Sequence, residues 1–193
     1  MIQSLCVFCG ASSGNDKRYS DLAFSVGRWL ALQNIQLVYG GGGIGLMGKL
    51  ADGVLSENGK IIGVIPGFLK KKEIAHAHLS EMIVTDTMHE RKIRMHELSD
   101  AAIALPGGYG TLDELFELLT WLQLGLHNKP IGLLNFNGFF NALIEMLNQM
   151  KTAEFLTPDH FNLLSVKPEI SLLIDALNIR KSPSSASNAG NGI

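Results

Sequence analysis

The sequence predicts an α/β fold: a single Rossmann-like, doubly wound parallel sheet with helices on both faces. Short continuous runs of Val, Ile and Leu alternate with helical patterns along most of the chain. Strands of a parallel sheet carry such unbroken apolar runs because helices cover both of their faces. Glycine is abundant, with 21 residues, and it clusters directly after two of the predicted strands. In folds of this class ligands bind where strands end and helices begin.

Each expected element follows from its own pattern. The first strand, SLCVFCG, precedes a helix over about 16–33, in which Leu22, Val26 and Leu30 share one stripe. Further strands are expected at 35–40, 60–67, 81–85, 101–108 and 129–135. Further helices are expected after the glycine cluster that follows residue 40, ending at about 58, and at about 88–98, 111–126 and 138–151. The segment 168–177 closes the fold. We expect one domain over residues 1–180 and a disordered tail over 181–193, which is small, polar and poor in apolar residues.

Composition restricts the class of partner. Charged residues make up 18% of the chain and the formal net charge is −2, so no basic field favours nucleic acid or anionic lipid. The first residues, MIQSLCVFCG, lack the basic region and long apolar stretch of a signal peptide. No apolar run approaches the roughly 18–20 residues of a membrane span. We therefore expect a cytoplasmic protein that binds neither nucleic acid nor membrane.

Two glycine motifs in the segment YGGGGIGLMGK match nucleotide-binding fingerprints only in part. The dinucleotide pattern G-x-G-x-x-G occurs twice, but the next strand ends without the acid that would hold a ribose. A Walker A loop requires Ser or Thr after Lys49, where Leu50 stands. These gaps weigh against a nicotinamide or flavin oxidoreductase and against an NTPase.

Cysteine and histidine patterns favour structural roles. Cys6 and Cys9 form a C-x-x-C, but along a strand an offset of three residues sends the two thiols to opposite faces. No second pair completes a zinc site, and the six histidines match no metal-ligand spacing. We expect two core thiols, solvated or hydrogen-bonding histidines, and no metal.

The stretch PGGYGTLDE, residues 106–114, is the leading candidate for a binding loop. Thr111 and Glu114 have the spacing of a capping box, in which the threonine caps a helix and the glutamate reaches back to its backbone. Capping needs one threonine, whereas three glycines before the helix favour close approach of backbone N–H groups to an anion. Asp113 and Glu114 would then lie in the first helical turn. Carboxylates repel a bound anion, so their presence beside an anion site suggests that they serve another part of the ligand.

A second segment, TMHERKIRMHE, supplies positive charge. Arg91, Lys92 and Arg94 fall on the helix expected after the strand EMIVT, where pairs with neighbouring glutamates would be a purely structural alternative. This helix and the helix after PGGYGT follow successive strands, so their first turns can face one cleft. Arginine suits phosphate or carboxylate, and Glu114 suits proton transfer or stabilisation of a cation.

Together, PGGYGTLDE and MHERK resemble the paired signatures P-G-G-x-G-T-x-x-E and H-E/Q-R-K of the LONELY GUY (LOG) family. The resemblance reaches about Leu177 and includes VFCGASSG, VYGGGGIGLMG and GVIPGFL. LOG proteins are cytokinin riboside 5′-monophosphate phosphoribohydrolases, often mislabelled as lysine decarboxylases, and nothing in this sequence resembles a pyridoxal phosphate site. The resemblance implies a hydrolase that releases free base and ribose 5-phosphate from a nucleoside 5′-monophosphate, without cofactor or metal.

The same resemblance implies residue roles and a homodimer. Arg91 and Glu114 would be the catalytic pair, with the glutamate stabilising oxocarbenium charge on the ribose or positioning water. Lys92 would lie beside Arg91 in the substrate site. A non-catalytic nucleotide-binding or carrier module of the same fold remains the alternative, and the choice between AMP and an isopentenylated nucleotide stays open. The other expected substrate contacts are Gly42, Gly43, Glu73, Gly107, Gly108, Tyr109, Gly110, Thr111 and Thr120.

Overall fold

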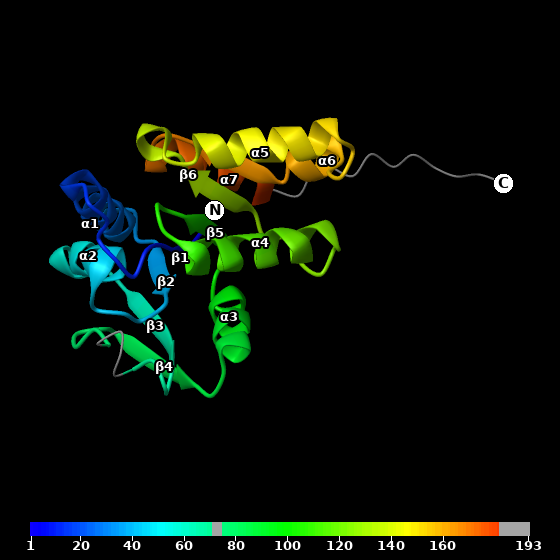
Figure 1. Ribbon diagram of the computed structural model, residues 1–193. Helices are drawn as coiled ribbons and strands as arrows, with labels where there is room; N and C mark the ends of the chain where they lie inside the picture. The colour runs from blue at the N-terminus through cyan, green and yellow to red at the C-terminus, as the bar shows by residue number, and fades with distance from the viewer. Residues whose placement is uncertain (71–74, 182–193) are drawn as a thin grey trace.

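Seven parallel strands form one sheet in the computed structural model, which describes residues 1–70 and 75–181 (Figure 1). The strands are β1 (Ser4–Phe8), β2 (Gln36–Tyr39), β3 (Ile61–Pro66), β4 (Glu81–Thr85), β5 (Ala101–Ala104), β6 (Ile131–Leu134) and β7 (Leu164–Lys167). Their order across the sheet is β4-β3-β2-β1-β5-β6-β7. The prediction of a doubly wound α/β sheet is confirmed.

Helices cover both faces of this sheet. They are α1 (Lys17–Leu32), α2 (Gly45–Ser56), α3 (Met88–Glu97), α4 (Tyr109–Gln123), α5 (Asn141–Thr152), α6 (Pro158–Phe161), α7 (Ile170–Lys181) and the 3-10 helix η1 (Phe136–Gly138). α1, α2 and α7 bury Leu30, Leu50 and Leu173 in the core on one face. α3 and α4 bury Met95 and Leu115 in the core on the other face, where α5 also packs. In Figure 1, α1 and α2 lie to the left of the strands and α3 to the right.

The winding of the chain determines where a ligand can bind. From β1 the strands are added outward to β4, and the chain then returns through α3 to place β5 on the other side of β1. α1 follows β1 and packs on one face, whereas α4 follows β5 and packs on the opposite face. Connections that diverge to opposite faces leave a crevice at the carboxyl ends of the two strands. The crevice between β1 and β5 is therefore the expected binding position.

The two cysteines illustrate the alternation of faces. Cys6 belongs to the core on the α3/α4 face and Cys9 to the core on the α1/α2 face, which confirms the prediction from their spacing. Both thiols are free and buried. Burial, with a smaller contribution from the Glu114 carboxylate, raises the pKa of both thiols well above the ordinary value. They are therefore neutral core groups at physiological pH, not thiolate nucleophiles.

Several boundaries near the end of the chain differ from the predictions. β7 and α6 were not predicted, because LSVK is a short edge strand without a long apolar run and PDHF is a single helical turn. The helix expected at 138–151 begins only at Asn141, since Asn137 and Gly138 have φ of 51° and 72° and form η1 instead. Lys181 ends α7, and the remainder of the predicted tail lies outside the described residues. No helix within the described ranges has both the length and the apolar character needed to cross a bilayer.

The contact between the ends of α3 and α4 predicts a dependence of stability on pH. The His96 ring packs against Trp121 and His127, with ring centroids 5.9 Å and 4.5 Å apart. Burial first, and then the charges of Lys129 and His127, lower the pKa of His96 from 6.5 to about 4. Between these two values the unfolded chain binds a proton that the folded protein does not, so acid favours unfolding. Stability should therefore fall as pH decreases from 6.5 to 4.

We expect this pH-dependent loss to shrink by about 1 kcal/mol in a His96→Gln variant, after allowance for solvent screening of a half-buried ring. Thermal unfolding measured at pH 7, 5.5 and 4 gives the difference. The matched control is His89→Gln, an exposed histidine on the same helix, which should retain the wild-type dependence. An equal loss in the His96→Gln variant and the wild type would contradict this assignment.

Candidate active site

A cavity of about 530 Å³ opens where the winding predicts it, at the carboxyl ends of β1 and β5. Its wall contains the loop after β1, the glycine turn after β5, and side chains from α2, α3 and α4. Arg91 and Glu114 both line it. The prediction that the segments HERK and PGGYGTLDE face one cleft is confirmed.

The glycine turn places the start of α4 against this cavity. The helix begins at Tyr109 with Gly108 as its N-cap, and no side chain caps it. The bond from the Leu112 N–H to the Gly108 carbonyl, 3.2 Å long, begins the helical ladder. The N–H groups of residues 109–111 precede this bond and are available to an anion, which the positive end of the helix dipole also favours.

This geometry corrects the capping-box alternative. Thr111 is the third residue of α4, not its cap, and its buried hydroxyl lies where a side chain at Gly107 would be placed. A Cβ at Gly107 would also approach the backbone nitrogen of Gly10 to 2.9 Å. Asp113 and Glu114 consequently fall in the second turn of the helix, one turn beyond the N–H groups.

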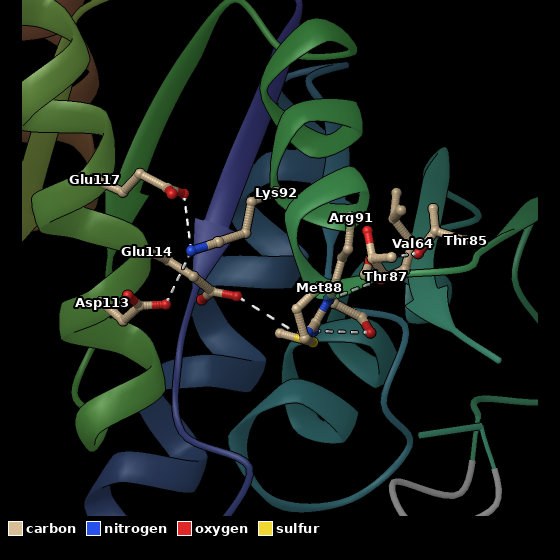
Figure 2. Close-up of polar contacts among 10 residues, drawn as sticks. Val64, Thr85, Thr87, Met88, Arg91, Lys92, Asp113, Glu114 and Glu117 are labelled. Carbon is tan, nitrogen blue, oxygen red and sulfur yellow. Dashed lines mark hydrogen bonds and ion pairs between the residues drawn. The ribbon is translucent and has the colours of Figure 1, made fainter. Parts of the chain in front are cut away.

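Arg91 is fixed by its own helix and by two strand ends (Figure 2). α3 begins with a capped turn, because the Glu90 N–H donates to the Thr87 hydroxyl over 3.0 Å. Arg91 is only 5% exposed, and its Nε and Nη2 donate to the carbonyl oxygens of Val64 and Gly40 over 3.1 Å and 3.2 Å. Its guanidinium is therefore held rigidly at the ends of β2 and β3.

The remaining side of the guanidinium faces a carboxylate. Arg91 Nη1 lies 4.0 Å from Glu114 Oε1, and the Glu114 side chain is 12% exposed. Two charges held this close on nearly buried side chains interact more strongly than an exposed pair. The arrangement keeps Glu114 oriented at the wall of the cavity.

Gly40 gives a direct test of the Arg91 position. A methyl group at Gly40 would overlap Arg91 Nη2, so Gly40→Ala should push the guanidinium away from its carbonyl partners. We expect any activity that depends on Arg91 to fall by about tenfold or more, because misplacement of a functional group by about 1 Å can cost about 10²-fold. Steady-state kinetics with thermal unfolding separates this effect from loss of fold. Full activity in the Gly40→Ala variant would show that Arg91 need not occupy this position.

Lys92 lies beside Arg91 but is directed elsewhere. Its Nζ is 3.2 Å from Asp113 Oδ2 and 3.0 Å from Glu117 Oε2, both on α4. Lys92 does not line the cavity, whereas Asp113 does. The structure thus brings Lys92 next to the site without placing its ammonium in it.

Comparison with known proteins identifies the family to which the chain belongs. A family model described as "Possible lysine decarboxylase" matches residues 47–177. A cytokinin riboside 5′-monophosphate phosphoribohydrolase of Arabidopsis thaliana is 44% identical over 173 residues, covering 90% of this chain and 81% of that protein. The chain belongs to the LOG family. A second Arabidopsis thaliana enzyme of that name is 43% identical over 177 residues, covering 92% of this chain and 78% of its own.

Proteins with little sequence similarity to this chain share its fold. The molybdenum cofactor carrier protein of Chlamydomonas reinhardtii superposes with a TM-score of 0.65 at 19% identity, covering 93% of this chain and 98% of that chain. Such a likeness supports the fold alone. No lysine is among the described residues that line the cavity.

The other residues predicted from the LOG resemblance differ in whether they line the cavity. Gly107, Gly108, Gly110 and Thr111 line the cavity. Gly42, Gly43, Tyr109 and Thr120 do not line it, and Glu73 lies outside the described residues.

The residues off the cavity have other contacts. Tyr109 is 95% exposed, and the Thr120 hydroxyl donates to the Phe116 carbonyl over 2.7 Å on the outer side of α4. Gly42 forms an isolated bridge with Ala75. Gly42 thus contacts the segment at Ala75, and residues 109 and 120 lie outside the wall of this cavity.

Sequence reasoning missed the loop after β1. Residues 10–15 line the cavity together with Tyr19 and Phe139, whose rings meet edge to face with centroids 5.6 Å apart. The signal was the serine pair in CGASSG directly after the first strand, but its importance depends on β1 being next to β5. No group of three or more metal-binding side chains occurs in the part of the chain that the structure describes.

Proposed function

We propose that this protein hydrolyses the N-glycosidic bond of a nucleoside 5′-monophosphate, as the names of its LOG relatives state for those enzymes. The products would be a free base, of the adenine or cytokinin class, and ribose 5-phosphate. One observation supports this most strongly: a nearly buried Arg91–Glu114 pair shares a cavity with the open N-terminus of α4. An anion site next to a shielded carboxylate suits a substrate that has a phosphate and develops positive charge.

The phosphate site would be the first turn of α4. Backbone N–H groups of residues 109–111 point out of the helix start, and Gly108 and Gly110 leave open space where side chains would stand. Backbone donors and the helix dipole bind phosphate without a charged side chain. With the phosphate there, the ribose extends along the cavity toward Glu114, one helical turn further on.

The bond-breaking step needs a negative group near the sugar. As the bond between C1′ and the base breaks, its electrons leave with the base and the ribose gains oxocarbenium character. The Glu114 carboxylate stabilises this charge and orients the water whose oxygen bonds to C1′, while the proton of that water passes to the departing base. Arg91, 4.0 Å from the Glu114 carboxylate, holds it in place. This role explains a carboxylate so close to a phosphate site.

The competing function is a nucleotide carrier without catalysis, which would use the same helix start to hold the phosphate. Chromatography of the protein incubated with AMP, and separately with isopentenyladenosine monophosphate, distinguishes the two. We expect free base from at least one nucleotide, and the faster substrate identifies the base that the site prefers. Tight binding of both nucleotides with no base release would favour the carrier.

A homodimer and a cytoplasmic location complete the proposal. Exposed apolar side chains on and after α4 support self-association: Tyr109, Leu124 and Leu126 are 95%, 65% and 70% exposed. Association would remove this apolar surface from water. Two free, buried thiols are consistent with a reducing compartment. Sedimentation of a monomer at micromolar concentration would count against the dimer.

A further inference from the structure

His76 fastens the chain that precedes β4 to the turn that holds Arg91, which covers residues 40–44 and is called the β2 turn below. The His76 N–H donates to the Gly41 carbonyl over 3.1 Å, and an isolated antiparallel bridge extends this contact by one residue. The neighbouring Gly40 carbonyl accepts from Arg91 Nη2 over 3.2 Å. The β2 turn therefore contacts the buried arginine through one carbonyl and His76 through the next.

The His76 side chain makes a second attachment, to the helix that follows the β2 turn. Its Nδ1 accepts from the His78 N–H over 3.4 Å, so the proton of the neutral ring lies on Nε2. That nitrogen donates to Asp52 Oδ1 over 3.2 Å. Asp52 belongs to α2, which begins at Gly45 directly after the turn. His76 thus holds the turn through its backbone and the following helix through its ring.

The contact between His76 and Asp52 is partly shielded and involves a charged acceptor. The two side chains are 12% and 43% exposed. Burial raises the pKa of Asp52, but hydrogen bonds from Lys49 and His76 outweigh it, and the net pKa is lowered. Asp52 is therefore ionised at physiological pH. A hydrogen bond to a charged group is stronger than one between neutral groups.

Close packing leaves the β2 turn little freedom on its other side. A Cβ at Gly63 of β3 would approach the Gly41 Cα to 2.9 Å and the Leu79 Cδ1 to 2.5 Å. Strand, turn and the segment that carries His76 therefore lie in direct contact. Closely packed groups transmit displacement to one another. A shift of the segment at His76 consequently changes the position of the carbonyl that orients Arg91.

We propose that His76 is a positioning residue for Arg91. Its N–H and its ring, through Asp52, hold the β2 turn so that the Gly40 carbonyl keeps the guanidinium in place. This inference rests on the hydrolase function proposed above. A displaced guanidinium no longer holds the Glu114 carboxylate in the orientation that bond cleavage needs, so loss of His76 slows base release.

His76→Ala removes the ring and keeps the backbone N–H. We expect kcat for AMP to fall about tenfold, because displacement of a catalytic group by less than about 1 Å is costly. Asp52→Ala should lower kcat by a similar factor, whereas His76→Gln keeps a donor for Asp52 and should retain most activity. Lys49→Met removes the other, exposed partner of Asp52 and should change kcat by less than about twofold. His78→Ala, on an exposed histidine of the same segment, should match the wild type.

A double variant distinguishes positioning from direct contact with the substrate. Gly40→Ala displaces Arg91 directly, so adding His76→Ala should cost less than the product of the two single losses. Direct contact between His76 and the substrate predicts two independent losses instead. It also predicts a weaker calorimetric Kd for AMP in His76→Ala at unchanged kcat.

Three results would overturn the positioning role. These are a lower melting temperature of His76→Ala with unchanged kcat, a loss confined to Kd, and fully multiplicative losses in the double variant. If the wild type releases no base, the hydrolase proposal fails on its own. Thermal unfolding still tests the link in that case. Melting-temperature losses of His76→Ala and Arg91→Met that combine to less than their sum support it, and fully additive losses contradict it.

Discussion

Glu114→Gln should remove nearly all base release while nucleotide binding persists. Glutamine keeps the shape of the side chain but carries no charge, so it cannot stabilise positive charge on the ribose or activate water. Loss of such a group costs about 10²–10⁴-fold in rate. The proposed phosphate contacts come from the backbone at the start of α4, which the substitution leaves in place. Adenine release followed by chromatography gives kcat, and calorimetry gives Kd.

The control for this variant is Glu145→Gln on α5, an exposed glutamate away from the cavity, which should keep wild-type kinetics. Thermal unfolding of both variants verifies that the fold is retained. If Glu114→Gln releases base at the wild-type rate, then Glu114 is not the catalytic carboxylate.

Arg91→Lys is expected to lower kcat about 10²-fold, the second largest effect. The planar guanidinium contacts the Val64 and Gly40 carbonyls and faces Glu114 at the same time. A lysine ammonium is a single point donor and cannot reproduce this fork. Measurement of kcat across pH 5–9 gives the effect. The substitution keeps the positive charge at position 91, so a loss of rate reports on the shape of the guanidinium.

The matched comparison is Arg94→Lys on the same helix, where the arginine is exposed and paired with Glu97 at 3.0 Å. We expect that variant to be within about twofold of the wild type, as surface ion pairs contribute little. Equal activities for Arg91→Lys and Arg94→Lys would contradict the need for a rigid fork at position 91.

The fold could be predicted from the sequence because its elements alternate so regularly. Apolar runs marked six of the seven strands, whereas β7 is a four-residue edge strand without such a run. The order of strands could not be predicted, since no local pattern states that β5 pairs with β1. For that reason the loop over residues 10–15 was missed as a wall of the cavity.

The sequence predicted that Arg91 and Glu114 lie close together, but it predicted the positions of Lys92 and Thr120 less well. Arg91 and Glu114 meet because α3 and α4 each follow a strand end and pack on the same face of the sheet. Thr120 is six residues beyond Glu114, a rotation of about 240° around a helix, so it faces another side. Lys92 is adjacent to Arg91 in sequence, but neighbours on a helix point in different directions, and its partners come from α4.

The most direct test of the hydrolase proposal is the identity and ratio of products from AMP. With the protein in molar excess, we expect adenine and ribose 5-phosphate in equal amounts from the wild type, and neither from Glu114→Gln. Adenosine with inorganic phosphate, or intact AMP recovered from a tightly bound complex, would contradict cleavage of the glycosidic bond at this site.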